Sequence, residues 1–363
     1  GGGFGGEGRP NPGLRPRSGR KTLEAAKPGE PILDMGMGDP QGAPVSTSLR
    51  VNQTDGPYYT ITEAMREAKV GDKVILTKGK YLESIRMTRP IQILGEGHVS
   101  DIIIETSGRD TVVFETEFGV LRGVTLRQRG TGFWNCLDIT SGELKVEGCD
   151  ITSQSLACIS VHRKGTNPTL RRLRIHNCGG TGVYVYDSAK GAVEDCDIFE
   201  NAQSGVEIAE GGDPEIKFNR IRENAQHGVL VHDNGKGHLT DNDIFKNRLA
   251  GVEVRESGNP KVHRNKIYGH ETSGGVYVHH YGRGELEKND VYNNSLSGIV
   301  VWQSGKPVCR QNRVSMNGEF GIHVRDGGWG TYEDNDLRAN ARGGILVNPD
   351  CKLKVIEDRN LID

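Results

Sequence analysis

The sequence predicts an all-β fold, a right-handed parallel β-helix (a solenoid), behind an irregular N-terminal extension. The main observation is a short phrase, Gly-(Val/Ile)-x-(Val/Ile/Leu), that returns eight times in the second half of the chain. Its glycines are Gly182, Gly205, Gly228, Gly251, Gly275, Gly298, Gly321 and Gly344. The spacing between neighbouring glycines is constant, except that the step from Gly251 to Gly275 is longer by one position. A fixed period of this kind, about 23 residues, is typical of repeat architectures.

The size of the repeat supports the same fold. A unit of about 23 residues with two or three short alternating strands cannot bury its own apolar face, so the units must stack. Coiling places each strand parallel to its equivalent in the next coil, about 4.8 Å away, with Val, Ile and Leu pointing inward. A leucine-rich repeat has a similar length, but its leucine frame is missing here and no helical segment separates the strands. We expect about twelve coils, or rungs.

Asparagines recur in register with the repeat and are the second observation. One column follows the second strand of each rung: Asn219, Asn242, Asn265, Asn289, Asn312 and Asn335. Another column lies a few positions further along each rung: Asn201, Asn224, Asn247, His270, Asn294, Asn317 and Asn340. At inward-turning corners, amide side chains can hydrogen-bond to their copies above and below, as in other asparagine ladders.

The elements follow in order along the chain. Residues 1–55 are an extension that begins with a Gly/Pro/Arg-rich stretch, which has little to bury and either wraps a partner or its own body or stays a free tail. Residues 56–363 form the β-helix domain. A short helix over 60–68 (TITEAMREA) is expected to cap its open end, because an uncovered end would expose the core and the strand edges. Alternating apolar residues predict short strands from about Val74, and regular rungs follow from about Ile102.

The charge, the cysteines and the lack of long apolar runs limit which cellular compartments and which classes of partner are expected. The formal net charge is −2, which argues against nucleic acid as a partner, because phosphate neutralisation needs a basic face. The seven cysteines include no Cys-x-x-Cys pair and are expected to be small buried hydrophobes in a reducing compartment. We therefore expect an intracellular protein of the cytoplasm or an organelle lumen, with secretion as the alternative. No apolar run is long enough to span a membrane, and we expect no transmembrane segment.

Parts of the sequence resemble known families. Residues 58–97 look like the opening of pectate-lyase-like and periplasmic copper-protein-like β-helix families. GNPKVHRNKI (258–267) and GRGELEKNDV (284–293) resemble the carbohydrate-binding and sugar-hydrolase-type repeats, and are closest to those of the large F-box adaptors of ubiquitin ligases. The resemblance implies the β-helix fold. Because such families span lyases, epimerases, binding modules and adaptors, it implies no single function.

Function is expected on the outward positions of the repeated phrase. These positions carry more Tyr, Trp, His and Arg than a neutral solvated sheet requires. The resemblance implies glycan binding along such a face, where aromatic rings can stack on sugars and Arg can pair with a uronate carboxylate. The candidate binding residues are Tyr184, Tyr186, His232, Glu253, Arg255, Tyr277, His279, Trp302 and Arg325.

A uronate lyase or epimerase needs a carboxylate neutraliser, a base and an acid. Arg255, His279 and Tyr277 could fill these roles in that order, although β-propensity alone also favours aromatics on exposed strands. No metal site or cofactor is expected. His232 and His279 lie two rungs apart, and His279 and His280 should alternate between faces.

The leading hypothesis is therefore a non-catalytic scaffold or recognition module, an accessory subunit of a larger assembly whose protein partners bind through residues 1–55. The alternative is an acidic-polysaccharide lyase or epimerase, or a glycan-binding protein, that uses the outward face of the repeated strands.

Overall fold

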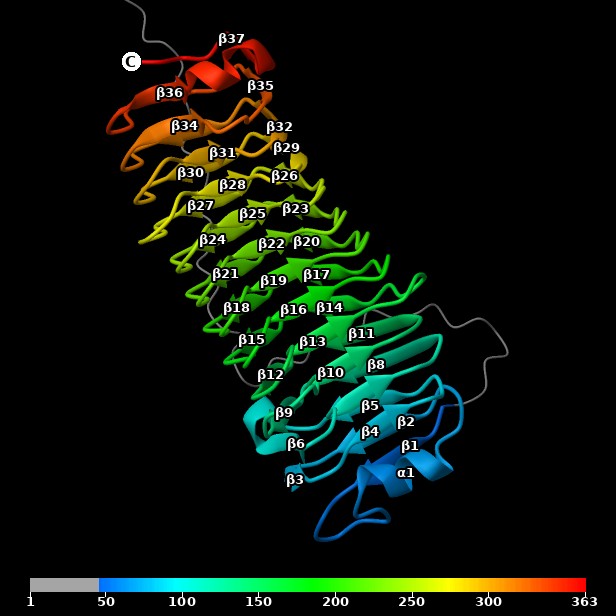
Figure 1. Cartoon of the computed structure of the whole chain (residues 1–363). Helices are drawn as coiled ribbons and strands as arrows, with labels where there is room; N and C mark the ends of the chain where they lie inside the picture. Colours follow the sequence, from blue (N-terminus) through cyan, green and yellow to red (C-terminus); the bar gives the residue numbers. More distant parts are fainter. Residues whose placement is uncertain (1–45) are drawn as a thin grey trace, which may run out of the picture. The chain divides into compact units, whose positions relative to one another are not determined.

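The computed structural model describes residues 46–363 and confirms the parallel β-helix. Three parallel sheets run along it, and Figure 1 shows their strands stacked coil on coil from β1 (blue) to β37 (red). The sheets have 14, 12 and 11 strands, so the stack is slightly longer than the expected twelve rungs. The Gly1–Lys21 stretch and its arginines lie outside the described residues.

Each complete rung contributes one strand to each of three sheets, named A, B and C here, and the rungs at the two ends are incomplete. Sheet A contains β1 (Ser48–Val51), β2 (Lys73–Leu76), β5 (Gln92–Gly95), β8 (Phe118–Arg122), β11 (Glu143–Glu147), β14 (Thr169–Arg171), β17 (Ala192–Glu194), β20 (Glu215–Lys217), β23 (His238–Thr240), β26 (Lys261–His263), β29 (Arg283–Glu287), β32 (Lys306–Arg310), β35 (Gly330–Glu333) and β37 (Val355–Asp358). Sheet B contains β3 (Gly79–Tyr81), β6 (Ile102–Ser107), β9 (Thr125–Arg129), β12 (Asp150–Ser153), β15 (Arg174–His176), β18 (Asp197–Phe199), β21 (Arg220–Arg222), β24 (Asp243–Phe245), β27 (Lys266–Tyr268), β30 (Asp290–Tyr292) and β33 (Arg313–Ser315). Sheet C contains β4 (Ile85–Met87), β7 (Val112–Phe114), β10 (Leu137–Ile139), β13 (Ile159–Val161), β16 (Val183–Val185), β19 (Val206–Ile208), β22 (Val229–Val231), β25 (Val252–Val254), β28 (Val276–Val278), β31 (Ile299–Val301), β34 (Phe320–Val324) and β36 (Gly343–Val347).

The repeated phrase forms the last eight strands of sheet C, from β16 to β36, in strict register. Val229 pairs with Val252, and Val252 pairs with Val276, so equivalent residues stack rung on rung. The two aliphatic residues of the phrase are buried in the core, as Val252 and Val254 are, except in the last phrase, where Ile345 and Val347 are partly buried. The residue between them points outward, which presents one row of side chains along the sheet.

The N-terminal end carries the predicted cap. Helix α1 (Ile61–Glu67) begins with a capping box in which Thr60 and Glu63 satisfy each other's backbone amides. Ile61 and Ala64 are buried against the end of the core. Strand β1 precedes the helix and pairs with β2, so the β-helix takes in residues before the expected boundary at 55/56. Two 3-10 turns, η1 (Val99–Asp101) and η2 (Pro349–Lys354), complete the elements, and no helix among residues 46–363 could cross a membrane.

Both asparagine columns form buried ladders. In the first, the side-chain amide of Asn242 donates to Oδ1 of Asn265 at 2.9 Å and the backbone N–H of Asn242 donates to the same oxygen at 3.0 Å. Asn265 repeats the pattern with Asn289 and also donates to the Leu239 carbonyl at 2.8 Å. Each asparagine side chain therefore pairs with backbone N–H and C=O groups of a buried turn, which are shielded from solvent.

The second ladder is interrupted at His270. The backbone N–H of Asn247 donates to His270 Nδ1 at 3.2 Å, and the His270 N–H donates to Asn294 Oδ1 at 3.3 Å. The imidazole offers no amide oxygen to the side chain of Asn247, which bonds to the Ile221 carbonyl. The Nε2 atom of His270 is buried without a hydrogen-bond partner. The interruption lies in the longer step of the repeat, between Gly251 and Gly275.

The cysteines are buried, and one pair departs from the expectation. Cys136, Cys149, Cys196, Cys309 and Cys351 are free and buried, as expected. Cys158 and Cys178 form a disulfide with a Cα–Cα distance of 5.8 Å. Their separation of 20 residues, nearly one rung, gave no sign of pairing in the sequence, but it brings the two interior positions together.

The glycines of the repeated phrase are needed for close packing, which predicts a large effect at Gly251. A Cβ there would lie 2.4 Å from Cγ2 of Ile267 and 2.9 Å from the backbone oxygen of Gly275. Gly251→Ala should lower the free energy of unfolding by about 2 kcal/mol, because an overpacked core must shift. Urea unfolding measures this. Gly148→Ala is the control, because its Cβ would meet open space and only its positive φ of 59° opposes the change. An equal loss in both variants would contradict the packing argument.

Candidate functional site

The outward row of sheet C, together with the residues that flank each strand, forms a half-buried polar surface, called here the sheet C face. Its central strands are β22, β25, β28 and β31 (Figure 1). Glu253 and Tyr277 are the middle residues of β25 and β28. Arg255, His279 and Trp302 directly follow their strands, where the chain turns. The in-register pairing of Glu253 with Tyr277 brings these side chains together.

Glu253 is the centre of the first cluster. Its carboxylate contacts Nε2 of His227 at 3.2 Å, Nε2 of His279 at 3.3 Å and Nε of Arg255 at 3.5 Å. Burial alone would raise the pKa of Glu253, but the hydrogen bond from His279 and the neighbouring positive charges outweigh it and lower the pKa. Burial lowers the pKa of His227 in spite of Glu253. The site therefore holds an ionised carboxylate below a surface of cationic and aromatic groups.

The aromatic side chains of the face stack on one another along the rungs. The ring of His279 stacks on Trp302 at 4.1 Å, and Arg325 of the next rung lies over the Trp302 ring at 5.4 Å. Tyr277 meets Trp302 edge-on, and its hydroxyl accepts a hydrogen bond from the Gly274 N–H at 3.2 Å. The ring of His279 therefore covers one face of Trp302, a side chain on which sugars were expected to stack.

His279 and His280 touch, which corrects the expectation that they alternate between faces. Strand β28 ends at Val278, and His280 has a φ of 45°, so the extended alternation does not reach it. The two Nδ1 atoms are in contact. His279 is only 7% exposed, whereas His280 is exposed to solvent.

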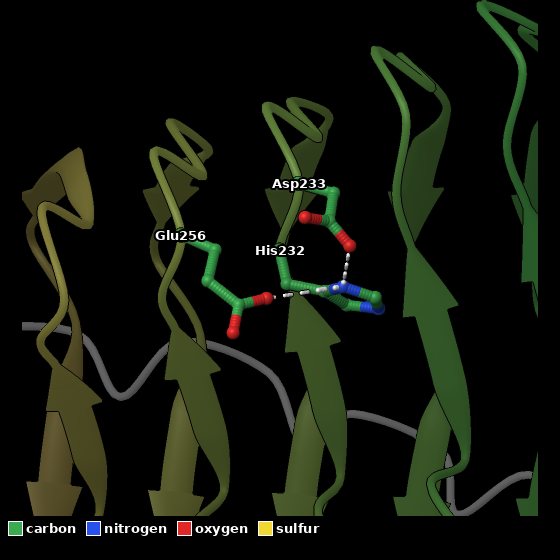
Figure 2. A group of neighbouring side chains, drawn as sticks. All are labelled: His232, Asp233 and Glu256. Atoms are coloured by element: carbon green, nitrogen blue, oxygen red, sulfur yellow. Dashed lines mark hydrogen bonds and ion pairs between the residues drawn. The ribbon is translucent and has the colours of Figure 1, made fainter.

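His232 is the centre of a second cluster. Its Nε2 bonds to Oε1 of Glu207 at 3.0 Å, and the Thr181 hydroxyl donates to the other oxygen of Glu207 at 2.7 Å. On its other side, Nδ1 lies 2.8 Å from Asp233 and 3.7 Å from Glu256 (Figure 2). The hydrogen bond with Glu207 raises the pKa of His232 against the effect of burial. Burial opposes ionisation of Glu207, yet the bonds from His232 and Thr181 lower its pKa.

Arg255 connects the two clusters. Its Nη1 donates to Oε1 of Glu256 at 2.8 Å, while its Nε faces Glu253. Two neighbouring buried atoms, Nδ1 of His227 and Oγ of Ser204, have no hydrogen-bond partner, and Nε of Arg255 also lacks a bond of normal geometry. Buried polar atoms are rarely left unpaired in native structures. This part of the face thus retains hydrogen-bonding capacity.

A third group lies toward the N-terminal end of the face. Tyr184 and Tyr186 stack at 4.4 Å, and Tyr186 stacks on His162 at 5.0 Å. His162 bonds to Asp138 at 3.1 Å. Burial raises the pKa of Tyr184 above its usual range, with the charge of Glu207 acting in the same direction.

Sequence reasoning missed His227, Asp233 and Glu256 as site residues. His227 precedes the glycine of its phrase, and the two acids follow the strands by two positions. Because the repeat is regular, the position before each glycine and the position two residues after each strand could have been aligned along the sequence, which would have revealed these residues. Asp233, His232 and Glu256 also offer three potential metal-ligating atoms within 4.8 Å of one another, although no metal site was expected from the sequence.

The fold and the polar face define this chain as a parallel β-helix protein with a row of ionisable side chains on one sheet. The family model of the right-handed β-helix region matches residues 122–267 and 219–359, and the chain belongs to this family.

Solved structures of similar fold include an alginate epimerase and a mannuronan C-5 epimerase. The periplasmic alginate epimerase AlgG is 14% identical, with a TM-score of 0.65 over 85% of this chain and 83% of that one. The A-module of the Azotobacter vinelandii mannuronan C-5 epimerase AlgE6 is 16% identical, with a TM-score of 0.60 over 80% of this chain and 90% of that one. At such identities the similarity shows the fold alone. The comparisons give no support to the expected closeness to F-box adaptors.

Proposed function

We propose that this chain acts on an acidic polysaccharide as a uronate epimerase or lyase, with the sheet C face as its active surface. The observation that carries the proposal is the contact of one ionised carboxylate, Glu253, with two imidazoles and a guanidinium on successive rungs. The shared fold of the alginate epimerase and the mannuronan C-5 epimerase supports it. The comparisons do not support the alternative of a non-catalytic scaffold.

Both reactions begin with the same step, removal of the proton from the sugar carbon next to the uronate carboxylate. Arg255, whose side chain is about one-third exposed, neutralises that carboxylate and so stabilises the carbanion that forms. His279 accepts the proton, and Glu253 stabilises the resulting imidazolium through its contact with Nε2. His280 is the exposed side chain that must turn aside for the substrate to reach Nδ1 of His279.

The fate of the carbanion separates the two reactions. Return of a proton from the opposite side of the ring inverts the carbon and completes an epimerisation. Tyr277 can supply this proton, because its oxygen accepts from the Gly274 amide and its own O–H stays free to donate. In elimination the electron pair of the carbanion instead forms the C4=C5 double bond and the C4–O bond breaks, so that an unsaturated uronate remains. Tyr277 then gives its proton to the oxygen of the leaving sugar.

Incubation in D₂O with mannuronan, alginate and polygalacturonate tests the proposal. Epimerisation should place deuterium on the uronate C5, seen by NMR, and elimination should produce the ultraviolet absorbance of unsaturated uronates. His279→Gln should lower the rate at least about 100-fold, because it removes the base. His238→Gln, an exposed histidine on sheet A, should leave the rate unchanged.

Binding of these polymers without deuterium exchange or elimination would reject catalysis and leave a glycan-binding module. Neither binding nor turnover with any of the polymers would reject the whole proposal.

A further inference from the structure

A column of acids follows the strands of sheet C on four successive rungs. Each member lies two positions after its strand and has a positive φ between 45° and 50°: Asp187, Glu210, Asp233 and Glu256. Rungs are about 4.8 Å apart, so like charges stack at short spacing and repel one another. Such a column favours cations, and at one point it meets a buried histidine.

That histidine, His232, is held in one orientation. Its side chain is 12% exposed, and its Nε2 bonds to Oε1 of Glu207. Because a carboxylate can only accept, Nε2 must carry the hydrogen of this bond. Glu207 is fixed in turn by the Thr181 hydroxyl. The second ring nitrogen, Nδ1, therefore faces the acid column.

Nδ1 is surrounded by acceptors. Oδ2 of Asp233 lies 2.8 Å away and Oε2 of Glu256 lies 3.7 Å away. A neutral imidazole would direct a lone pair at these oxygens, with no hydrogen between them. Figure 2 shows the three side chains converging from two neighbouring rungs. The arrangement needs a cation at this point, either a second proton on the ring or a metal ion.

We propose that Nδ1 of His232 and the carboxylates of Asp233 and Glu256 bind a divalent transition-metal ion such as Zn²⁺ or Mn²⁺. The three donor atoms lie within 4.8 Å of one another. Metal–ligand bonds of about 2.1 Å place neighbouring donors roughly 3–4 Å apart. The distance of 3.7 Å from Nδ1 to Glu256 lies in this range, and the distance of 2.8 Å from Nδ1 to Asp233 must lengthen slightly to admit an ion. The site differs from the sequence expectation of no metal.

The donor set selects the class of ion. An imidazole with two carboxylates suits zinc or manganese, whereas Ca²⁺ takes six to eight oxygen ligands. The side chains of Asp233 and Glu256 are 56% and 42% exposed, so water can complete the coordination. Arg255 occupies Oε1 of Glu256, which opposes a cation by charge but leaves Oε2 directed at the histidine.

The carboxylate of Glu207 does not bind the ion itself but accepts a hydrogen bond from the other ring nitrogen of the ligand His232. Metal-bound histidines usually donate their other ring N–H to a carboxylate, which fixes the tautomer and makes the ligand more basic. Glu207→Gln should therefore weaken metal affinity about 10–100-fold without removing a ligand.

Calorimetric titration of the chelator-treated full chain with ZnCl₂ and MnCl₂ tests the site, with CaCl₂ for comparison. One ion per chain should bind, and Zn²⁺ should raise the melting temperature, because a ligand of the folded state stabilises it. Asp233→Asn and Glu256→Gln should each weaken binding at least about tenfold. Both are nearly isosteric, and Asn tolerates the positive φ at position 233. Circular dichroism establishes that each variant is folded.

Asp326→Asn is the matched control. Asp326 occupies the same turn position with a φ of 48°, but its neighbour is Arg325 rather than a histidine. It should bind the metal as the unaltered chain does.

Absence of Zn²⁺ and Mn²⁺ binding, or equal affinity in Asp233→Asn and Asp326→Asn, would overturn the proposal and leave a proton as the cation between these groups. The measurement needs no substrate, so its outcome is independent of the proposed enzymatic function.

Discussion

Replacement of Asn265 by alanine should lower the free energy of unfolding by about 3–5 kcal/mol, because the change leaves several buried polar groups without partners. It removes the acceptor for the backbone and side-chain N–H groups of Asn242 and the donor to the Leu239 carbonyl. Each buried polar group left without a partner costs about 1–3 kcal/mol. Water cannot replace the lost bonds, because Asn265 is fully enclosed between two other asparagines of the ladder.

Urea unfolding followed by circular dichroism measures the loss. Asn259→Ala is the matched control, because Asn259 is exposed in a turn shortly before β26 and should change stability by less than about 0.5 kcal/mol. If the two variants were equally stable, the ladder would contribute nothing beyond the aliphatic core.

Acidification from pH 7 to pH 5 should destabilise the folded chain through His270. Burial lowers the pKa of His270 to about 4. An unfolded chain takes up this proton near pH 6.5, so between the two values the unfolded state binds more protons and stability falls as the pH falls. The loss should be about 2 kcal/mol at pH 5 and about 3 kcal/mol at pH 4. Above about pH 7.5 the histidine should contribute no pH dependence, because both states are then neutral.

His270→Asn isolates this contribution, because asparagine occupies every other position of the same ladder column from 201 to 340. The variant should lose less stability between pH 7 and pH 5 than the unaltered chain, as measured by urea unfolding at each pH. Burial also lowers the pKa of His227, which destabilises the fold in acid in the same direction. The free energy of unfolding of the variant should therefore still decrease somewhat as the pH falls. His238→Asn, exposed on β23, is the control. An unchanged slope in His270→Asn would show that His270 does not titrate in this range.

The fold could be predicted because the same residue types recur at the same positions in each regular rung. Gly251 and Asn265 have equivalents one rung away, so their spacing alone revealed stacking, inward valines and amide ladders. The Cys158–Cys178 disulfide could not be predicted in this way, because it occurs once and in an irregular early rung.

The candidate site was predictable only in part. Glu253, Arg255 and His279 were expected on one face from strand alternation, and the structure brings them into contact. His227 and Asp233 lie outside the strands, where alternation says nothing about direction. Their placement depends on the turn that follows or precedes each strand, and the left-handed conformation of Asp233 is what aims its carboxylate at His232.

The histidine in the second asparagine ladder also has a mechanical consequence. In an array where each unit couples mainly to its neighbours, separation begins at the weakest coupling. His270 accepts no hydrogen bond from the side-chain amide of Asn247, although such a bond joins neighbouring asparagines elsewhere in this ladder. Burial also disfavours the charged imidazole, so protonation destabilises His270 in the core. The three sheets and the first asparagine ladder continue across this rung, so the second ladder alone is weakened there. We expect mild acid or a pulling force to loosen the second ladder first at this rung.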